Sequence, residues 1–399
     1  MYAEEKNREE APMVKSVRRS FFFLLLLVPL LAWLSSHAAD KYVLNRWNAE
    51  DSSVVILDEV LARESESPAE SEGDWETENV RIRITYRNGP KKGTTEDLDI
   101  LRLADSRLAL LPGREYLLLL DTFDDGFQQY SISDRYRIPV VVGFITLVCA
   151  ALAVLAGKAG VKALCGLFLS LFLLLGWFVP LLAAGYTPVP FAIFAIAGVS
   201  IITIAFVVPK RILWPIPFIG AVGGAIAASV TGWTMIALWQ LTGLENDSAV
   251  LLFSVAPHLE LRGLMLAAVM VGAIGAVLDV AISVTSSMAE LYSYDPSIPL
   301  RRLWRAGLNV GSDVLGSMIN TLILAYLGSS LPFVVLIAME GPDLIALLND
   351  PHIAQEILRS VAGTVGLLLT IPVTAGAGVW WIARSHSHHE NRKEEVSAD

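Results

Sequence analysis

The sequence contains few of the residues from which redox centres, thiolate metal sites and nucleic-acid surfaces are built. Two of its 399 residues are cysteines, Cys149 and Cys165, and both fall inside apolar runs. Two cysteines in apolar runs do not provide the thiol groups that a disulfide framework or a thiolate metal site needs. Charged residues make up 18% of the chain and the formal net charge is -10, which is unlike a basic nucleic-acid footprint. We expect no cofactor, no metal ion, no nucleic-acid partner and no redox chemistry.

Apolar residues, in contrast, are present in excess. They account for 54% of the chain, and the mean hydropathy is +0.54, well above that of an average soluble protein. We divided the sequence at charges and at proline and glycine clusters into segments of about 20 residues, the length that crosses a bilayer. Seven such segments lie near residues 138–156, 163–184, 188–208, 213–240, 262–288, 307–330 and 360–383. With one earlier apolar run they predict an all-α membrane protein of about eight transmembrane helices.

The earlier run, FFFLLLLVPLLAWL, covers residues 21–34 and follows a basic segment. Its length is typical of a signal-peptide core, whereas the run extended through Ala39 approaches the length of a membrane anchor. We assign residues 1–20 to a cytoplasmic basic tail and residues 21–39 to a transmembrane anchor, with a cleaved signal peptide as the alternative. In either case the segment that follows is exported.

The exported segment, residues 40–137, shows the period-two alternation of β-strands. Four stretches carry it: VVILDEVLARE, NVRIRITYRNG, EYLLLLDTF and FQQYSISDRYR. Between them, ESESPAESEGDWETE, from Glu64 to Glu78, indicates a flexible acidic loop, and NGPKKGT, from Asn88 to Thr94, indicates a turn. We expect a small β-rich, open-barrel-like domain of roughly five strands.

The distribution of lysine and arginine predicts the orientation of the spans. Basic residues occur in both tails and in alternate loops, near Lys158, Lys210 and Arg301, whereas the interiors of the intervening loops have none. By the positive-inside rule both termini are cytoplasmic, and residues 40–137 are extracytoplasmic.

The same rule completes the domain organisation. Residues 138–383 form a seven-helix transmembrane domain, and residues 384–399 form a cytoplasmic tail. Residues 331–339, LPFVVLIAM, are too short to cross the bilayer. The sequence leaves open whether they are re-entrant, interfacial or a continuation of the preceding span.

Two aspartates, Asp279 and Asp313, lie well inside predicted spans. An aspartate at the centre of a membrane helix costs about 2.5 to 3.5 kcal/mol on insertion scales, so such side chains usually face the bundle interior or a watery cavity. Each lies roughly two turns from the predicted cytoplasmic loop that joins the two spans, which puts them at similar depths.

Small and polar residues follow each aspartate at helical spacing. In the sixth span the stripe comprises Gly275, Asp279, Ser283 and Ser287. In the seventh it comprises Asn309, Asp313, Ser317 and Asn320, with Gly307 and Gly311 before the aspartate. Because glycine permits close helix approach and serine or asparagine can hydrogen-bond across an interface, we expect the two stripes to face each other.

Two carboxylates at the same depth in the membrane would form a proton or cation site. Desolvation and mutual repulsion would raise at least one pKa and leave a proton that can exchange with a metal ion or be relayed. The alternative is that both stripes are helix-packing surfaces, with protonated aspartates hydrogen-bonded to the asparagines and no transport role.

The two spans also carry a family resemblance. The stretches GAIGAVLDVAISVTSSMAELY, residues 272–292, and RAGLNVGSDVLGSMINTLILAYLGSS, residues 305–330, resemble the YibE/F family of prokaryotic polytopic membrane proteins. The resemblance extends more loosely over the other spans and the exported domain. It implies a plasma-membrane location, seven or eight spans and an extracytoplasmic domain. It implies no catalytic residues, because the family is uncharacterised.

Three functions fit these features. We expect a permease, with Asp279 and Asp313 as proton or cation ligands and Asn309, Asn320, Ser283 and Ser287 as a polar shell. An alternative is an envelope-sensing or structural protein that acts through its β domain. A remote alternative is an intramembrane aspartyl protease, but Ser312 replaces a glycine of the GxGD motif, so we expect no enzyme.

The partners expected from this interpretation are membrane lipid and an unidentified small solute or ion. A homo-oligomer or another membrane partner is compatible with the sequence.

Overall fold

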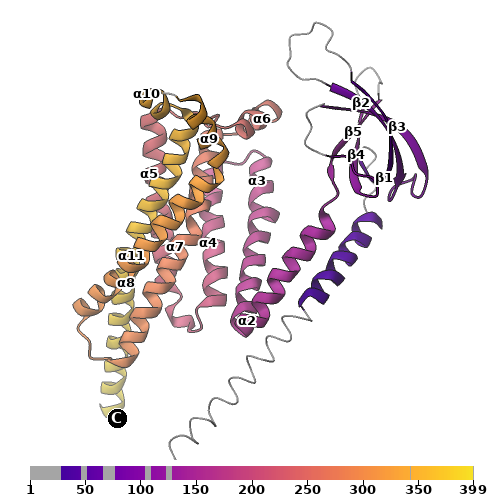
Figure 1. Ribbon diagram of the computed structural model, residues 1–399. Helices are drawn as coiled ribbons and strands as arrows, with labels where there is room; N and C mark the ends of the chain where they lie inside the picture. The colour runs from indigo at the N-terminus through magenta and orange to yellow at the C-terminus, as the bar shows by residue number, and fades with distance from the viewer. Residues whose placement is uncertain are drawn as a thin grey trace, which may run out of the picture. The chain divides into compact units, whose positions relative to one another are not determined.

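A computed structural model describes residues 28–45, 52–65, 77–103, 109–122, 128–341 and 343–398 (Figure 1). The chain divides into two compact units, Met1–Val161 and Lys162–Asp399, which are described separately. The start of the predicted anchor, residues 21–27, and most of the predicted acidic loop, residues 66–76, lie outside the described residues.

The first unit contains a barrel of five strands. The strands are β1 (Ser52–Ser65), β2 (Thr77–Tyr86), β3 (Thr95–Leu103), β4 (Glu115–Thr122) and β5 (Gln128–Arg135). They follow the order β1-β2-β3-β5-β4, with β3 and β5 parallel and the other neighbours antiparallel. This is the strand order of the OB-fold, a Greek-key barrel. The barrel is closed rather than open as expected, because β1 also pairs with β4, from Ser52 opposite Leu119 to Ile56 opposite Glu115.

Alternation along the strands builds the barrel core. Val80, Ile82 and Ile84 of β2 are fully buried, whereas Arg81 and Arg83 between them point outward. The predicted turn between β2 and β3 is present, and Gly89 and Gly93 in it have positive φ angles of 74° and 82°. The four strands expected from the sequence are thus found, together with β3.

Outward-facing charges on β2 and β3 pair across the strands. Arg81 Nε lies 2.7 Å from Asp99 Oδ1, and Arg83 Nε lies 2.8 Å from Asp97 Oδ1. In both pairs Nη2 also bonds the second carboxylate oxygen, so the contacts are bidentate. The register of the two strands therefore matches opposite charges on the outer face.

A helix over residues 28–45 precedes the barrel and packs onto it. Leu44 forms a buried cluster with Val54 of the barrel and with Tyr136, which follows β5. Arg87 bonds both Asp40 of this helix and Glu115 of β4. The helix is continuous from residue 28 to residue 45.

The apolar segment after the barrel is interrupted at Gly157. The assigned helices α2 (Ile138–Leu173), η1 (Leu174–Phe178) and α3 (Val179–Ala183) follow one another without a loop. At Gly157, however, φ is 56° and ψ is -132°, which only glycine adopts readily. A Cβ at Gly160 would overlap the carbonyl oxygen of Leu152, eight residues earlier, so the chain folds back at this point.

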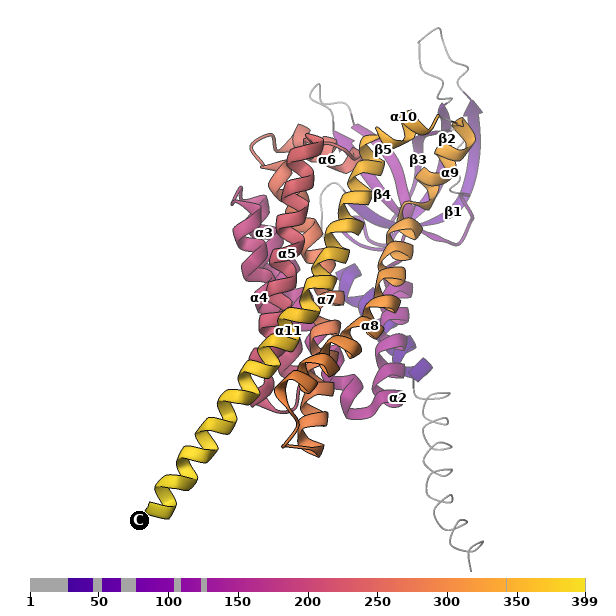
Figure 2. The same ribbon diagram turned by 90° about the vertical axis from the view of Figure 1, so that its left-hand side faces the viewer.

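The second unit is a helical bundle with α7 at its centre. Its principal helices are α4 (Pro188–Val207), α5 (Pro215–Trp239), α7 (Leu261–Tyr294), α8 (Leu300–Ser329) and α11 (Pro351–Ala398). α7 packs against the other four, which follow one another around it in the order α4, α5, α11, α8. Figure 2 shows α11 crossing the bundle, with α5 on one side of it and α8 on the other.

Shorter elements complete this unit: η2 (Arg211–Leu213), α6 (Asp247–Val255), α9 (Leu331–Glu340) and α10 (Leu344–Leu348). Residues 331–339, left open by the sequence, fall in α9, a separate helix that starts after Ser330. The Phe333 ring of α9 contacts the His352 ring of α11, with centroids 4.9 Å apart. The predicted tail, residues 384–399, continues α11 as helix to Ala398.

Small residues bring α5 and α11 into close contact. Gly220, Gly224, Ala228 and Gly232 recur every fourth residue on α5, and they face Thr374, Thr370, Gly366 and Ala362 of the antiparallel α11. A Cβ at Gly224 would overlap Thr370 Oγ1 and lie 2.9 Å from the carbonyl oxygen of Gly366. Thr370 and Thr374 are fully buried, and their hydroxyls donate to the carbonyls of Gly366 and Thr370, each four residues earlier.

Among the described residues, six helices are long and apolar enough to cross a membrane. The segment Ile138–Ala183, which contains the reversal at Gly157, is counted as one of them. The expectation of a largely helical membrane protein with a small β domain is therefore confirmed, whereas the count of eight spans is not.

Candidate functional site

One stripe of α7 remains open in the bundle. Between residues 263 and 289 its exposed residues are Ala268, Gly272, Gly275, Asp279 and Ser286, which recur at intervals of three, four and seven. Residues on the other faces, such as Val277, Val280 and Ala281, are fully buried. Asp279 therefore lies on the single open side of an otherwise enclosed helix.

The neighbours of α7 locate this stripe. The arc of helices around α7 begins with α4 and ends with α8. Tyr326 of α8 borders the stripe, since its hydroxyl lies 3.2 Å from the position that a Cβ on Gly272 would take. The stripe therefore opens on the side of α7 between α8 and α4.

The chemistry of the stripe differs from that of other open faces in the bundle. α4 exposes Phe194 and Ile201, which are 66% and 53% exposed, and α5 exposes Val230 and Trp233, which are 58% and 64% exposed. Such apolar surfaces suit contact with lipid chains. The α7 stripe has only alanine, glycine, serine and aspartate, so it is suited to water or a polar solute.

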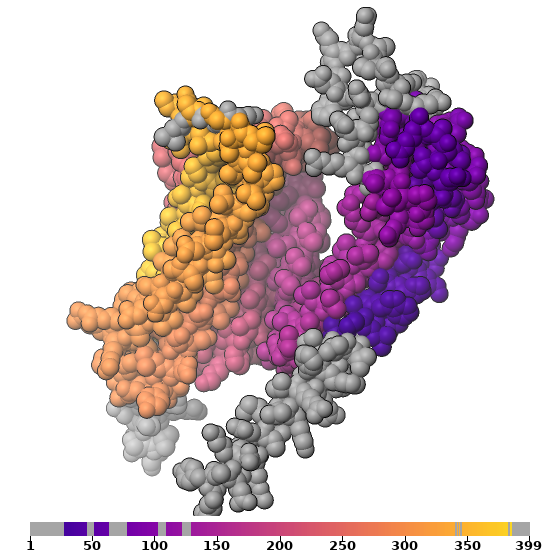
Figure 3. All heavy atoms as spheres, in the orientation of Figure 1, coloured from indigo at the N-terminus to yellow at the C-terminus, as the bar shows by residue number. Residues whose placement is uncertain are grey.

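The polar stripe of α8 faces away from the bundle. Asn309, Asp313, Ser317 and Asn320 are all exposed, and Figure 3 shows α8, in orange, at the surface of its unit. Gly307 and Gly311 are buried instead, and a Cβ there would press on Met288 of α7 and Ile371 of α11. Asp313 is two residues beyond Gly311, a rotation of about 200° around the helix.

The prediction that the polar stripes of α7 and α8 face each other is therefore wrong for this bundle. The glycines of α8 determine which face packs inward, and helical geometry then turns Asp313, Asn309 and Asn320 outward. Ser283 and Ser287 of α7 are half-buried, and Gly275, expected as a packing residue, has no atom within 4 Å of a Cβ built on it. A shared-proton dyad of Asp279 and Asp313 has no support in this arrangement.

No hydrogen bond or ion pair to another described residue is found for Asp279 or Asp313. Among the described residues, no group of three histidine, cysteine, aspartate or glutamate side chains could hold a metal ion. Each aspartate therefore stands as a single carboxylate on a helix surface.

The structure adds polar groups on α11 and α8 that the sequence analysis did not select. Arg359 Nη1 of α11 lies 2.9 Å from Glu356 Oε1, and both side chains are roughly 30% exposed. Tyr326 of α8 is close enough for its hydroxyl to interact electrostatically with this pair. The i, i+3 spacing of opposite charges at a span end is the sequence signal for this pair.

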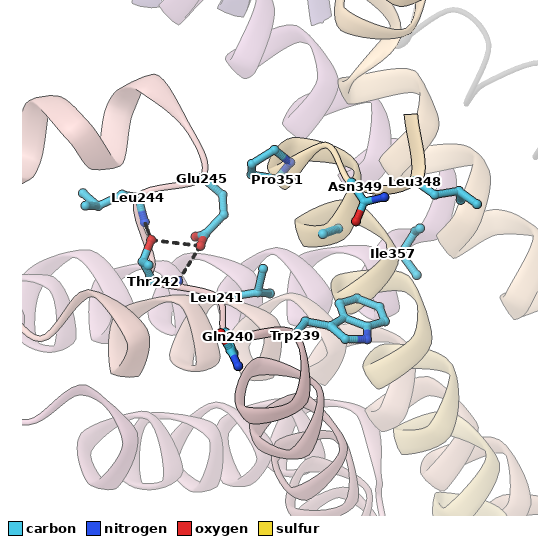
Figure 4. A pocket seen from close by; sticks show the side chains of 11 residues that line it. Trp239, Gln240, Leu241, Thr242, Leu244, Glu245, Leu348, Asn349, Pro351 and Ile357 are labelled. Carbon is cyan, nitrogen blue, oxygen red and sulfur yellow. Dashed lines mark hydrogen bonds between the residues drawn. The ribbon is translucent and has the colours of Figure 1, made fainter. Parts of the chain in front are cut away.

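A cavity of about 630 Å³ lies where α5 ends and α11 begins (Figure 4). Its apolar wall comes from Trp239, Leu241, Leu348, Pro351 and Ile357. Its polar residues are Gln240, Thr242, Glu245 and Asn349. Glu245 is a buried carboxylate, only 6% exposed, in the loop between α5 and α6, and no sequence pattern predicts its burial.

Comparison with known proteins agrees with the membrane architecture. The profile of the YibE/F-like protein family matches residues 144–384, which is more than half of the chain. The chain belongs to the YibE/F family. The resemblance seen in residues 272–292 and 305–330 is thereby confirmed. No curated protein and no solved structure gives a significant match.

The YibE/F match has clear limits along the chain. It begins at residue 144, after the barrel, and ends at residue 384 within α11. The Asp279 stripe, the Asp313 stripe and the cavity beside Glu245 all lie within the matched region, whereas the five-stranded barrel lies before it.

Proposed function

We propose that this YibE/F protein is a permease of the prokaryotic plasma membrane, coupled to a proton or a cation. The α7 stripe supports the proposal, because a carboxylate lies on the one open side of the central helix and the residues around it are small and polar. An aspartate held against lipid would cost about 2.5 to 3.5 kcal/mol, which water or a counter-ion along the stripe would relieve.

The proposed topology has eight spans with both termini in the cytoplasm and the barrel outside. Two features support it: the basic residues of alternate loops and the reversal at Gly157, which divides a segment too long for a single crossing. In this topology the first span is the uncleaved anchor, of which residues 28–39 are helical.

In this proposal Asp279 binds and releases the coupling ion, and the half-buried Ser283 and Ser287 are polar groups near it. Asp313, with Asn309 and Asn320, forms a second polar surface on α8 that needs a polar cover within the membrane. The two aspartates then act at separate surfaces, which predicts that their substitutions have separable effects.

The test is flux into liposomes that contain the purified protein, with proton, alkali-cation and divalent-cation gradients. We expect Asp279→Asn to lower flux at least tenfold, because the amide can neither exchange a proton nor bind a cation as strongly. Asp313→Asn is measured beside it. The matched control is Asp295→Asn, the same change at an exposed loop carboxylate that accepts hydrogen bonds from Ser297.

Flux that persists in Asp279→Asn, with normal insertion and folding, would remove the α7 stripe as the transport site. Flux lost only in Asp313→Asn would move the site to α8. The same loss in Asp295→Asn would mean that the change acts through folding rather than through the ion.

A second candidate function rests on the barrel. Its strand order is shared by OB-folds, which commonly bind oligonucleotides or oligosaccharides on the β2–β3 face, and here that face carries the Arg81–Asp99 and Arg83–Asp97 pairs. This likeness favours an exported domain that recognises a polar envelope ligand. The support is the analogy of fold.

A further inference from the structure

The outward face of α8 is polar through the middle of the helix. Between residues 309 and 320 its exposed residues include no apolar side chain: they are Asn309, Ser312, Asp313, Gly316, Ser317 and Asn320. We call this surface the α8 polar face. At about 1.5 Å per residue it is roughly 17 Å long, and it lies at the centre of a 30-residue helix. In a membrane it would therefore lie within the hydrocarbon core, which is about 30 Å thick.

The amides and the carboxyl group of this face lack polar contacts within the chain. No hydrogen bond or ion pair to another described residue is found for Asn309, Asp313 or Asn320. Lipid chains offer neither donors nor acceptors, so polar side chains at this depth are stable only against other polar groups. The α8 polar face therefore requires a partner from outside its own bundle.

The shape of the face suits close contact with another helix. A Cβ at Gly316 would meet nothing within 4 Å, so no contact inside the bundle requires a glycine there. Ser312 and Gly316 have the small-xxx-small spacing that lets two helix backbones approach closely in a membrane. Asn309 and Asn320 lie on the same side of the helix, two turns before Gly316 and one turn after it. Contact at Gly316 would thus bring both amides within reach of the partner helix.

The chemistry of the face is complementary to itself. A carboxamide has both donors and an acceptor, so Asn309 can pair with the same residue of a second copy, and Asn320 can do likewise. Two copies in one membrane have the same topology, so a two-fold axis along the membrane normal puts identical residues at the same depth. Asn309 is one turn from Asp313, so the amide of one copy can also donate to the carboxyl group of the other.

Other spans of the same chain offer fewer matching groups. The predicted spans contain no asparagine or glutamine besides these two, except Gln240 at a span end. Residues 28–39 and 138–156 of the first unit contain no asparagine, glutamine, aspartate, glutamate, lysine or arginine. A second α8 is therefore the span of this chain that best matches an amide-bearing face.

We propose that the protein forms a parallel two-fold dimer through the α8 polar faces of two copies. Gly316 lies at the closest approach of the two helices, and Asn309 and Asn320 pair across the axis. The inference concerns assembly, goes beyond the proposed function and does not depend on ion transport.

The first test is disulfide crosslinking of the full-length protein in membranes, in a background without the two native cysteines. Gly316→Cys and Asn320→Cys place single thiols on the face. The controls are Met318→Cys, on the side of α8 that packs against the bundle core, and Val230→Cys, on the apolar surface of α5. We expect at least about fivefold more crosslinked dimer from the face variants, because a two-fold axis brings the same residue of both copies together.

The second test measures the dimer directly, by single-molecule photobleaching of labelled protein in liposomes over a range of protein-to-lipid ratios. Asn309→Leu/Asn320→Leu removes the amides and leaves a face that suits lipid, so the variant should insert. Its dimer affinity is expected to fall at least about tenfold. Asn349→Leu, the same change at an exposed amide outside α8, is the matched control and should leave the dimer unchanged.

Three results would overturn the proposal: a monomeric wild-type protein at every ratio, a dimer unaffected by Asn309→Leu/Asn320→Leu, or equal crosslinking at face and control positions. A crosslinked product of Gly316→Cys that contains another protein instead of a second copy would also overturn it and would assign the face to that protein. None of these outcomes depends on flux through Asp279.

Discussion

At the scale of single residues, glycine controls how closely the helices approach. Gly220 and Gly224 allow the backbone of α5 to lie against Thr374, Thr370 and Gly366 of α11, where any Cβ would overlap an atom. Gly275 has a similar sequence context on α7, yet a Cβ there meets nothing within 4 Å. The requirement for glycine at a given position therefore depends on the neighbouring helix rather than on the local sequence.

This difference predicts opposite outcomes for the same substitution. Gly224→Ala is expected to destabilise the protein by about 1 to 3 kcal/mol, because the added methyl group overfills a packed interface. Gly275→Ala is the matched control and is expected to be neutral or stabilising by up to about 1 kcal/mol, since alanine is the better helix former. Thermal unfolding of the two purified variants in one detergent measures the difference. Equal Tm values would contradict the close contact of α5 and α11.

At the scale of elements, the outer face of β2 and β3 makes the barrel sensitive to acid. The hydrogen bond from Arg83 holds the pKa of Asp97 below its usual value, and the bond from Arg81 does the same for Asp99. A carboxyl whose folded pKa is lowered contributes stability above its unfolded pKa, about 3.9, and the contribution is lost as the pH falls through the folded pKa. Both side chains are solvent-exposed, so the effect of each pair is small.

We therefore expect the strand pair to loosen below about pH 4. Hydrogen–deuterium exchange of peptides from residues 77–103, corrected for the intrinsic rate, should show faster uptake at acidic pH. The double variant Arg81→Gln/Arg83→Gln should show faster uptake already at pH 7 and a smaller response to acid. Arg114→Gln, at an exposed position without an ion pair among the described residues, is the control. An unchanged acid response in the double variant would mean that other groups cause it.

Among the helices, α7 and α8 show how packing assigns different surroundings to similar sequences. Both contain an aspartate among glycines and serines at helical spacing. α7 is enclosed except along the stripe of Asp279, whereas α8 packs through Gly307 and Gly311 and exposes the whole face of Asp313. The sequence was sufficient to select both carboxylates, but not to decide which helix face meets a neighbour.

At the scale of the whole molecule, the proposed topology can be tested with cysteine labelling. The chain has two cysteines, so a cysteine-free background needs Cys149→Ala and Cys165→Ala. Single cysteines then replace exposed residues between the predicted spans: Ser254 of α6 and Asn349 on the predicted outer side, and Lys210 and Ser297 on the predicted inner side.

In intact cells, a membrane-impermeant maleimide is expected to label the cysteines at positions 254 and 349 only. Labelling at positions 210 and 297 should require permeabilised cells, because the positive-inside rule predicts that these basic loops face the cytoplasm. The reverse pattern would invert the topology, and labelling of all four positions in intact cells would contradict a transmembrane arrangement.

Much of the architecture followed from composition and periodicity. Apolar length predicted the membrane helices, period-two alternation predicted the strands, and the spans of Asp279 and Asp313 predicted the family. These features depend on local hydrogen bonding and on the transfer of side chains between water and an apolar phase. They can therefore be predicted from the order of residues along the chain.

The tertiary structure decided what depends on contacts between distant residues. The barrel closes because β1 pairs with β4. Asp313 lies on the outer face of α8 because Gly311 packs against Ile371 of α11. The cavity beside Glu245 exists because α11 returns to the end of α5, more than 100 residues later in the chain. Composition and periodicity specify which residues a helix or strand contains and which of them share a face, whereas its partner is selected by the packing of all the elements together.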